Sequence, residues 1–169
     1  RVLVFDVHSD QLTNGQAASF VIGQSDFTSD EPGLSSRKIR QPDGISYDAK
    51  NDHLYLTDKG HQRVLVFDVH PDRMQSLPEA ISVIGEPDFD NVRSGPGDAR
   101  HHPDRLHDPR GSYFDSVDQR LFQSEGLNGR MTVFTLPRDA YRVDLPARSS
   151  LRYASLDAQM STGPQALQS

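Results

Sequence analysis

Histidine and aspartate, residue types that bind divalent metals, crowd one short segment of the chain. Zinc accepts imidazole and carboxylate ligands, but dedicated sites present them at characteristic spacings. No such spacing occurs here, and Pro103 marks the segment as a loop. We therefore predict no metal site at this cluster, whose members are His101, His102, Asp104, His107 and Asp108.

Other patterns that carry chemistry are incomplete or missing. The acidic segments 26–31 and 88–90 lack the carboxylate spacing and central glycine of a dedicated calcium loop. The absence of cysteine excludes disulfides, thiolate metal sites and cysteine nucleophiles, and leaves the redox compartment open. Neither a Gly-x-Ser-x-Gly element nor a phosphate-binding glycine loop is present. The sequence therefore predicts no catalytic residue, no metal and no cofactor.

Basic residues recur at a fixed offset. Lys38 recurs as Arg105 and Arg40 as His107, an offset of 67 (105 − 38). The chain as a whole is acidic, with a formal net charge of −6. Recurrence in loops suggests recognition of an anionic or polar partner, because loops on a rigid scaffold concentrate binding residues. The alternative is ordinary solubilising charge, diluted by neighbouring acidic residues.

These offsets follow from a repeat that runs through the chain. The octapeptide Arg-Val-Leu-Val-Phe-Asp-Val-His occupies residues 1–8 and again 63–70, an offset of 62 (63 − 1). Val-Ile-Gly recurs at the same offset, at 21–23 and 83–85. At the offset of 67, Pro42 aligns with Pro109, Gly44 with Gly111, Asp58 with Glu125 and Arg63 with Arg130. Such self-similarity indicates one structural unit used several times.

Short apolar segments between turn residues predict β-strands. One complete unit would comprise strands at 44–48, 53–57, 64–69 and 80–85. The segment from Val64 to Phe67 is continuously apolar, so its strand needs cover on both faces of the sheet. Stacked four-stranded blades provide that cover. We therefore predict an all-β fold, a partial β-propeller in which residues 44–85 and 111–145 form two antiparallel sheets packed face to face.

The domain plan follows the repeats. Residues 1–145 are predicted to hold the blades: 1–23 the end of one, 44–85 a complete one, and 111–145 a degraded one whose fourth strand is Tyr141 to Leu145. Residues 146–169 are rich in Ser, Ala and Gln and are predicted to be a mobile tail or linker. Because residue 1 already lies inside a repeat, we expect the intact protein to contain further blades. The outer faces of the terminal blades should then be exposed, and the isolated chain should self-associate or melt early.

The pattern Pro-x-Gly-Ile-x-x-Asp, Leu-Tyr-Leu-Thr-Asp and Arg-Val-Leu-Val-Phe-Asp resembles the NHL repeat. The Val-Ile-Gly-Gln-x-Asp-Phe element is similar to that of long-repeat NHL proteins of bacteria. The resemblance covers residues 1–135, about two and a half repeats, closely at 44–68 and weakly at 111–134. It implies a β-propeller, usually six-bladed, that serves as a binding platform. Peptidylglycine-type lyases resemble this fold, but the expected inner strands here lack their zinc-binding histidines.

In such a blade, the loop entering the first strand and the turn between the second and third strands share one rim. We predict that this rim carries the ligand-binding residues Lys38, Arg40, Lys59, His61, Arg105 and His107. Asp58 and Arg63, like Glu125 and Arg130, are predicted to face each other across a hairpin and to stabilise it. The alternative is that they bind ligand themselves.

The function that these observations favour is a non-catalytic recognition or scaffold module that binds a protein, peptide or glycan on one rim. The alternative is part of a propeller hydrolase or lyase whose catalytic groups lie on other blades. RNA binding is a weaker alternative, because the chain is acidic and no aromatic residues are interleaved with the basic ones. No apolar run is long enough to span a membrane. The family resemblance alone suggests an extracellular or cell-envelope location.

Overall fold

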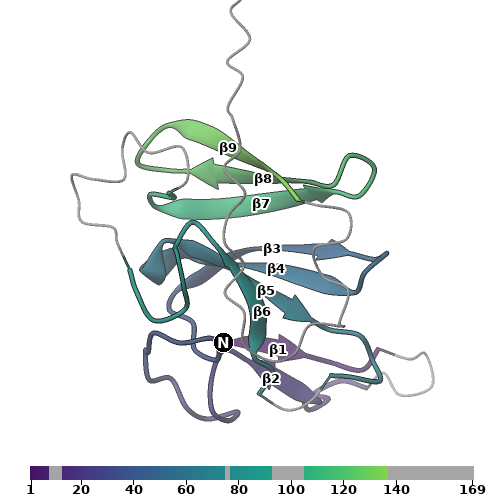
Figure 1. Ribbon diagram of the computed structural model, residues 1–169. Coiled ribbons are helices and arrows are strands. Elements are labelled where there is room, and N and C mark those ends of the chain that lie inside the picture. Colours follow the sequence, from purple (N-terminus) through teal and green to yellow (C-terminus); the bar gives the residue numbers. More distant parts are fainter. Residues whose placement is uncertain (8–12, 75–76, 93–104, 137–169) are drawn as a thin grey trace, which may run out of the picture.

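The computed structural model describes residues 1–7, 13–74, 77–92 and 105–136, which form three stacked antiparallel sheets (Figure 1). The first sheet pairs β1 (Val2–Val4) with β2 (Phe20–Ile22). The second has the order β3 (Pro42–Asp48), β4 (His53–Asp58), β5 (Arg63–Asp68) and β6 (Ala80–Ile84). The third has the order β7 (Pro109–Asp115), β8 (Arg120–Glu125) and β9 (Arg130–Thr135).

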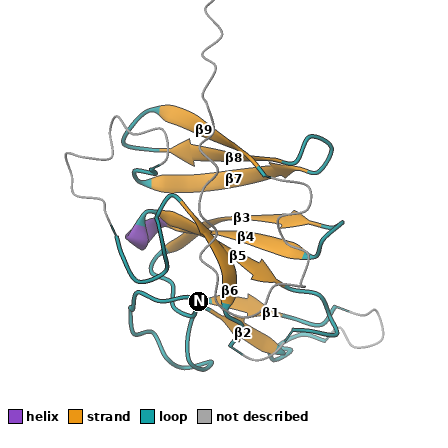
Figure 2. Cartoon of the chain, in the orientation of Figure 1, coloured by secondary structure: helices purple, strands orange, loops and turns teal. Residues whose placement is uncertain are grey.

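Helix is almost absent from the described residues. One 3-10 turn, η1 (Lys59–His61), connects β4 to β5 (Figure 2). No helix in these residues is long and apolar enough to cross a membrane.

Strand β5 is covered on both faces, as its continuous apolar sequence predicts. Val64, Leu65, Val66 and Phe67 are each 0% exposed. Val64 and Val66 pack in a cluster with residues of the third sheet, whereas Leu65 and Phe67 pack in a cluster that includes Ile22 of the first sheet. Successive strand side chains point to opposite faces, so this one strand joins both layers of the core.

The second and third sheets are in close contact through their first strands. The ring of Tyr55 stacks on that of Phe114, with centroids 4.8 Å apart. The Oγ atoms of Ser46 and Ser112 lie 3.3 Å apart, between β3 and β7. A Cβ atom at Gly44 would lie only 2.8 Å from the backbone nitrogen of Ser112, so glycine allows these strands to approach.

The recurring Val-Ile-Gly element has a structural cause. Gly23 directly follows β2 and Gly85 directly follows β6. Their φ angles are 83° and 92°, in the left-handed region that favours glycine. A Cβ on Gly23 would collide with the side chain of Ile39, and one on Gly85 would crowd Leu106. Each glycine therefore makes room for the loop that enters the next sheet.

The structure confirms the all-β prediction and the four-stranded antiparallel unit, and the sheets are those of a partial β-propeller. Strands β3 and β5 begin slightly earlier than predicted, at Pro42 and Arg63. The predicted strand at 141–145 and the predicted tail at 146–169 lie outside the described residues. The division into 1–145 and 146–169 therefore stays a prediction.

Candidate functional site

The loops that enter β3 and β7 lie at the same end of the sheets as the η1 turn. Pro42, at the start of β3, pairs with Asp58, which immediately precedes η1. Pro109, at the start of β7, pairs with Glu125 in the same way. Contacts between β3 and β7 place the two loops side by side. We call the surface formed by residues 37–41, 59–62 and 105–108 the entry rim; η1 marks it in Figure 2.

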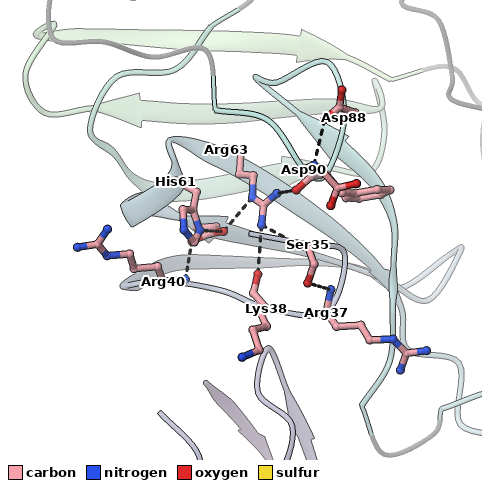
Figure 3. Close-up of polar contacts among 10 residues, drawn as sticks. Ser35, Arg37, Lys38, Arg40, His61, Arg63, Asp88 and Asp90 are labelled. Carbon is pink, nitrogen blue, oxygen red and sulfur yellow. Dashed lines mark hydrogen bonds and ion pairs between the residues drawn. The ribbon is translucent and has the colours of Figure 1, made fainter. Parts of the chain in front are cut away.

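A buried ion pair underlies the entry rim. Arg63 and Asp58 face each other across the β4–β5 hairpin, with Nε 2.9 Å from Oδ2, and both side chains are 0% exposed. The guanidinium of Arg63 also donates to the carbonyl oxygens of Phe89, Ser35 and Lys38, at 2.7, 3.0 and 3.1 Å (Figure 3). The predicted cross-strand pair is thus present, but it is buried and ties two loops to the hairpin.

The acidic partner of this pair holds the entry loop from the other side. One carboxylate oxygen of Asp58 accepts a hydrogen bond from the backbone N–H of Arg40 at 2.7 Å. The carbonyl of Arg40 in turn accepts from the N–H of Gly60 in η1, at 2.8 Å. Side chain and backbone together fix the position of the loop relative to the turn.

The third sheet repeats this arrangement. Arg130 Nε lies 2.7 Å from Glu125 Oε1, and Arg130 donates to the carbonyl of Arg105 at 2.9 Å. Glu125 accepts from the backbone N–H of His107 at 2.9 Å. In each sheet, the backbone carbonyl of the first residue of the recurring pair, Lys38 or Arg105, accepts a hydrogen bond from the arginine of the hairpin. The backbone N–H of the second residue, Arg40 or His107, donates to the carboxylate of the hairpin. The positions that recur at the offset of 67 are therefore equivalent because their backbone groups make the same hydrogen bonds in both sheets.

Hydrogen bonding decides the charge state of Glu125. Burial raises the pKa of its carboxyl, but hydrogen bonds from Arg130, Thr132, His107 and Asn128 outweigh burial and hold the pKa below its ordinary value of 4.5. The carboxylate is therefore charged at neutral pH and fully engaged by donors.

Four of the six predicted binding residues carry cationic side chains that reach solvent to different degrees. Arg40 is exposed, while Lys38, Lys59 and Arg105 are half-buried. Lys38 Nζ lies 3.8 Å from an oxygen of Glu31. In Figure 3 the side chains of Lys38 and Arg40 point away from Arg63 and diverge from each other. The rim positions are shared, but the side chains do not converge on one point.

The two predicted histidines are buried. The Nδ1 atom of His61 lies 2.9 Å from Asp58 Oδ2, and the side chain is 11% exposed. The Nδ1 atom of His107 lies 3.3 Å from Asn128 Oδ1, and the residue is 7% exposed. Both rings belong to the network beneath the rim, so they can position the loops but present little surface to a ligand.

Asp108 of the entry rim and Arg110 of β7 form an ion pair that the sequence did not predict. Asp108 accepts from Arg110 at 2.9 and 3.0 Å and lies 3.4 Å from Lys59 Nζ of the neighbouring sheet. Burial raises the pKa of the Asp108 carboxyl, but its bonds to Arg110 and Lys59 bring the pKa below the ordinary 3.8. This carboxylate neutralises part of the positive charge. Its contact with Lys59 depends on sheet packing, which no local pattern signals.

A hollow of about 290 Å³ opens beside Arg40. This volume is at the small end of the range for ligand pockets. It lies between Arg1, which precedes β1, and the loop that connects β2 to β3. Its lining comprises Arg1, Gln24, Ser29, Asp30, Pro32, Ile39, Arg40 and Gln41.

Among the described residues, no group of three or more His, Cys, Asp or Glu side chains is placed to hold a metal ion. Three members of the His/Asp cluster, His101, His102 and Asp104, lie outside the described residues. The metal prediction for that segment therefore stays untested.

Comparison with known proteins identifies the repeat. Residues 40–67 match the family model of the NHL repeat, which confirms the resemblance at β3, β4 and β5. No curated protein matches the chain. The matched segment begins at Arg40, on the entry rim, and includes both members of the buried Asp58 and Arg63 pair.

Proposed function

We propose that this chain, which carries an NHL repeat within a partial β-propeller, is a non-catalytic recognition module that binds its partner on the entry rim. NHL repeats generally form β-propeller interaction modules. The finer proposal is that the rim recognises an anionic or polar surface of a protein, peptide or glycan. Its residues would be Lys38, Arg40, Lys59, His61, Arg105 and His107.

The observation that carries the proposal is the setting of Arg40. Its backbone is bonded on one side to Asp58 and on the other to Gly60, while Arg40 as a residue is exposed and, like Arg1, belongs to the lining of the hollow. Because the backbone at Arg40 is already fixed, only the side chain has to be ordered when it binds a carboxylate or sulfate. Bidentate geometry makes arginine well suited to such groups.

The remaining predicted residues contribute to the proposed site in three different ways. Lys38 and Arg105 add positive charge at equivalent positions of adjacent sheets. Lys59, already 3.4 Å from Asp108, links those sheets across the rim. His61 and His107 hold the turn and the loop from below, through Asp58 and Asn128.

The test uses two anionic probes in parallel, an acidic peptide and a sulfated glycan, with association rates measured at low and high salt. Charged rims accelerate encounter chiefly at low salt. Arg40→Glu should slow association at low salt about tenfold, with a smaller effect at high salt. The matched control is Arg73→Glu, the same charge change at an exposed side chain paired with Asp68.

Equal slowing by both variants would show that only net charge matters and would contradict a rim site. Unchanged association of Arg40→Glu with both probes would contradict recognition of anionic groups at Arg40. A response to one probe alone would identify whether the rim prefers peptide carboxylates or glycan sulfates.

A further inference from the structure

At the entry rim, a carboxylate of the chain itself lies between two cations from adjacent sheets. Asp108 accepts two hydrogen bonds from Arg110 at the same oxygen, Oδ2, from Nε at 3.0 Å and from Nη2 at 2.9 Å. Its other oxygen, Oδ1, lies 3.4 Å from Nζ of Lys59. Arg110 belongs to β7 of the third sheet, whereas Lys59 belongs to η1 of the second. The two cations therefore approach one carboxylate only because these sheets stack.

The backbone beneath this carboxylate is fixed. A Cβ atom on Gly126 would lie 2.5 Å from Asp108 Oδ2 and 2.8 Å from Arg110 Nε, so both charged groups rest directly on this glycine. The N–H of Gly126 donates to the carbonyl of Asp108 at 3.0 Å. The carbonyl of Arg110 accepts from the amide of Gln123, a fully buried side chain, at 2.9 Å. We call Lys59, Arg110 and Gly126 the carboxylate seat.

The two cations of the carboxylate seat reach solvent more than the carboxylate does. The side chains of Arg110 and Lys59 are 49 and 26% exposed, and that of Asp108 is 12% exposed. A guanidinium carries five N–H donors and an ammonium three, more than Asp108 engages. A carboxylate that arrives from solvent can therefore reach the same cations, but the charge of Asp108 opposes it.

The repeat indicates that the loop does not need this carboxylate in order to fold. At the offset of 67 (108 − 41), Asp108 corresponds to Gln41. The φ angles of the two residues are 52° and 53°, so the same backbone conformation is compatible with an uncharged amide side chain. The charge of Asp108 is thus a feature of the carboxylate seat and not a requirement of the turn.

We infer that Lys59 and Arg110 form a binding site for a carboxylate of the partner, and that Asp108 occupies this site until the partner arrives. Asp108 is then an internal competitor that limits the affinity of the entry rim. The occupant is itself an aspartate side chain, which favours an acidic peptide as the ligand. The inference rests on the proposed binding function, to which it adds Arg110 as a ligand-binding residue and Asp108 as the residue that restrains it.

The experiment compares the Kd of a glutamate-rich peptide, at low salt, for the unmodified chain and for Asp108→Asn. Asparagine is similar in size and adopts the left-handed backbone conformation readily, but it carries no charge. Because a unit charge about 4 Å away changes a binding constant about fivefold even in water, Asp108→Asn should bind the peptide about fivefold more tightly. Asp108→Gln, which introduces the residue type found at Gln41, provides a second variant with the same expected gain.

The matched control is Asp68→Asn, which removes the same charge at the opposite end of the second sheet. The side chain of Asp68 is 14% exposed and accepts two hydrogen bonds from Arg73, at 2.7 and 3.1 Å. Its replacement should leave the Kd of the peptide nearly unchanged. Far-UV circular dichroism verifies that each variant folds.

A second substitution tests whether Arg110 receives the ligand. Arg110→Gln alone should weaken binding little, because Asp108 already engages the guanidinium. In the Asp108→Asn background, the same substitution should abolish the gain in affinity. Such non-additivity is expected for residues that share one partner, and a purely structural role of Asp108 would not produce it.

Four results would overturn the inference. An equal gain in Asp68→Asn would mean that only net charge matters. An unchanged Kd for both Asp108 variants, while Arg40→Glu still slows association, would contradict the competitor and leave the proposed function standing. Absence of peptide binding by the unmodified chain and by both variants would contradict the proposed function as well. A gain for a sulfated glycan without one for the peptide would contradict the assignment of a peptide carboxylate.

Discussion

Replacement of Arg63 by methionine should be among the most damaging substitutions in the described part of the chain. Methionine fills similar space but removes four hydrogen bonds, one to the Asp58 carboxylate and three to backbone carbonyls. It also leaves a buried carboxylate without its cation. Breaking a buried ion pair in this way costs about 3–5 kcal/mol.

That loss is large relative to the whole stability of a domain, which is about 5–15 kcal/mol. For a chain of this size, each kcal/mol lowers Tm by about 2–4 °C, so Arg63→Met should melt about 6–20 °C lower. Urea unfolding with linear extrapolation gives the free energy directly.

Two further substitutions test two other factors, the geometry of the guanidinium and the burial of the ion pair. Arg63→Lys keeps the positive charge but has no planar fork to reach four acceptors, so its loss should lie between those of wild type and Arg63→Met. Arg130→Met removes the equivalent residue of the third sheet, whose side chain is 30% exposed. Solvent screening should reduce that loss to about 1–2 kcal/mol.

The reasoning would be refuted if Arg63→Met lost less than about 1 kcal/mol, the scale of an exposed pair. It would also fail if Arg130→Met were as damaging as Arg63→Met, because burial would then not set the cost. A fully stable Arg63→Lys would show that the three carbonyl bonds contribute nothing.

Two other predictions concern packing and pH. Gly44→Ala should cost about 1–3 kcal/mol, because its Cβ would press on the backbone of β7, whereas Gly111→Ala, whose nearest neighbour would be Ser124 Oγ at 3.8 Å, should be tolerated; equal urea midpoints for the two variants would contradict this. Because the folded-state pKa of Glu125 is lowered from 4.5, its carboxylate stabilises the fold above that pH, and this contribution is lost as the pH falls through the lowered pKa. Glu125→Gln should therefore be less stable at neutral pH and lose less stability on acidification, and parallel stability curves from pH 7 to about pH 3 would disprove the role of Glu125.

The sequence alone determined the strands and the way they stack. The repeated octapeptide identified the unit, and the unbroken apolar run from Val64 to Phe67 required a core on both sides of β5. These features are local: strand formation follows from the residue types, and cover on both faces follows from their lack of alternation. Even the weak third repeat preserves the backbone, since Asp52 and Gln119, 67 residues apart, share a φ of 55°.

Only the tertiary structure decided what the recurring polar residues do. From the sequence, Lys38 and Arg105 recur as cations; in the structure, what recurs is the carbonyl that Arg63 and Arg130 bind. Burial of Asp58 and Arg63 depends on loops from positions 35–38 and 89, which are distant in the chain and reach the pair only when the sheets stack. Such long-range contacts decide whether a charged side chain is exposed and available for recognition or buried in a structural ion pair. The residue type fixes the hydrogen-bonding capacity of a side chain, but it does not fix the partners.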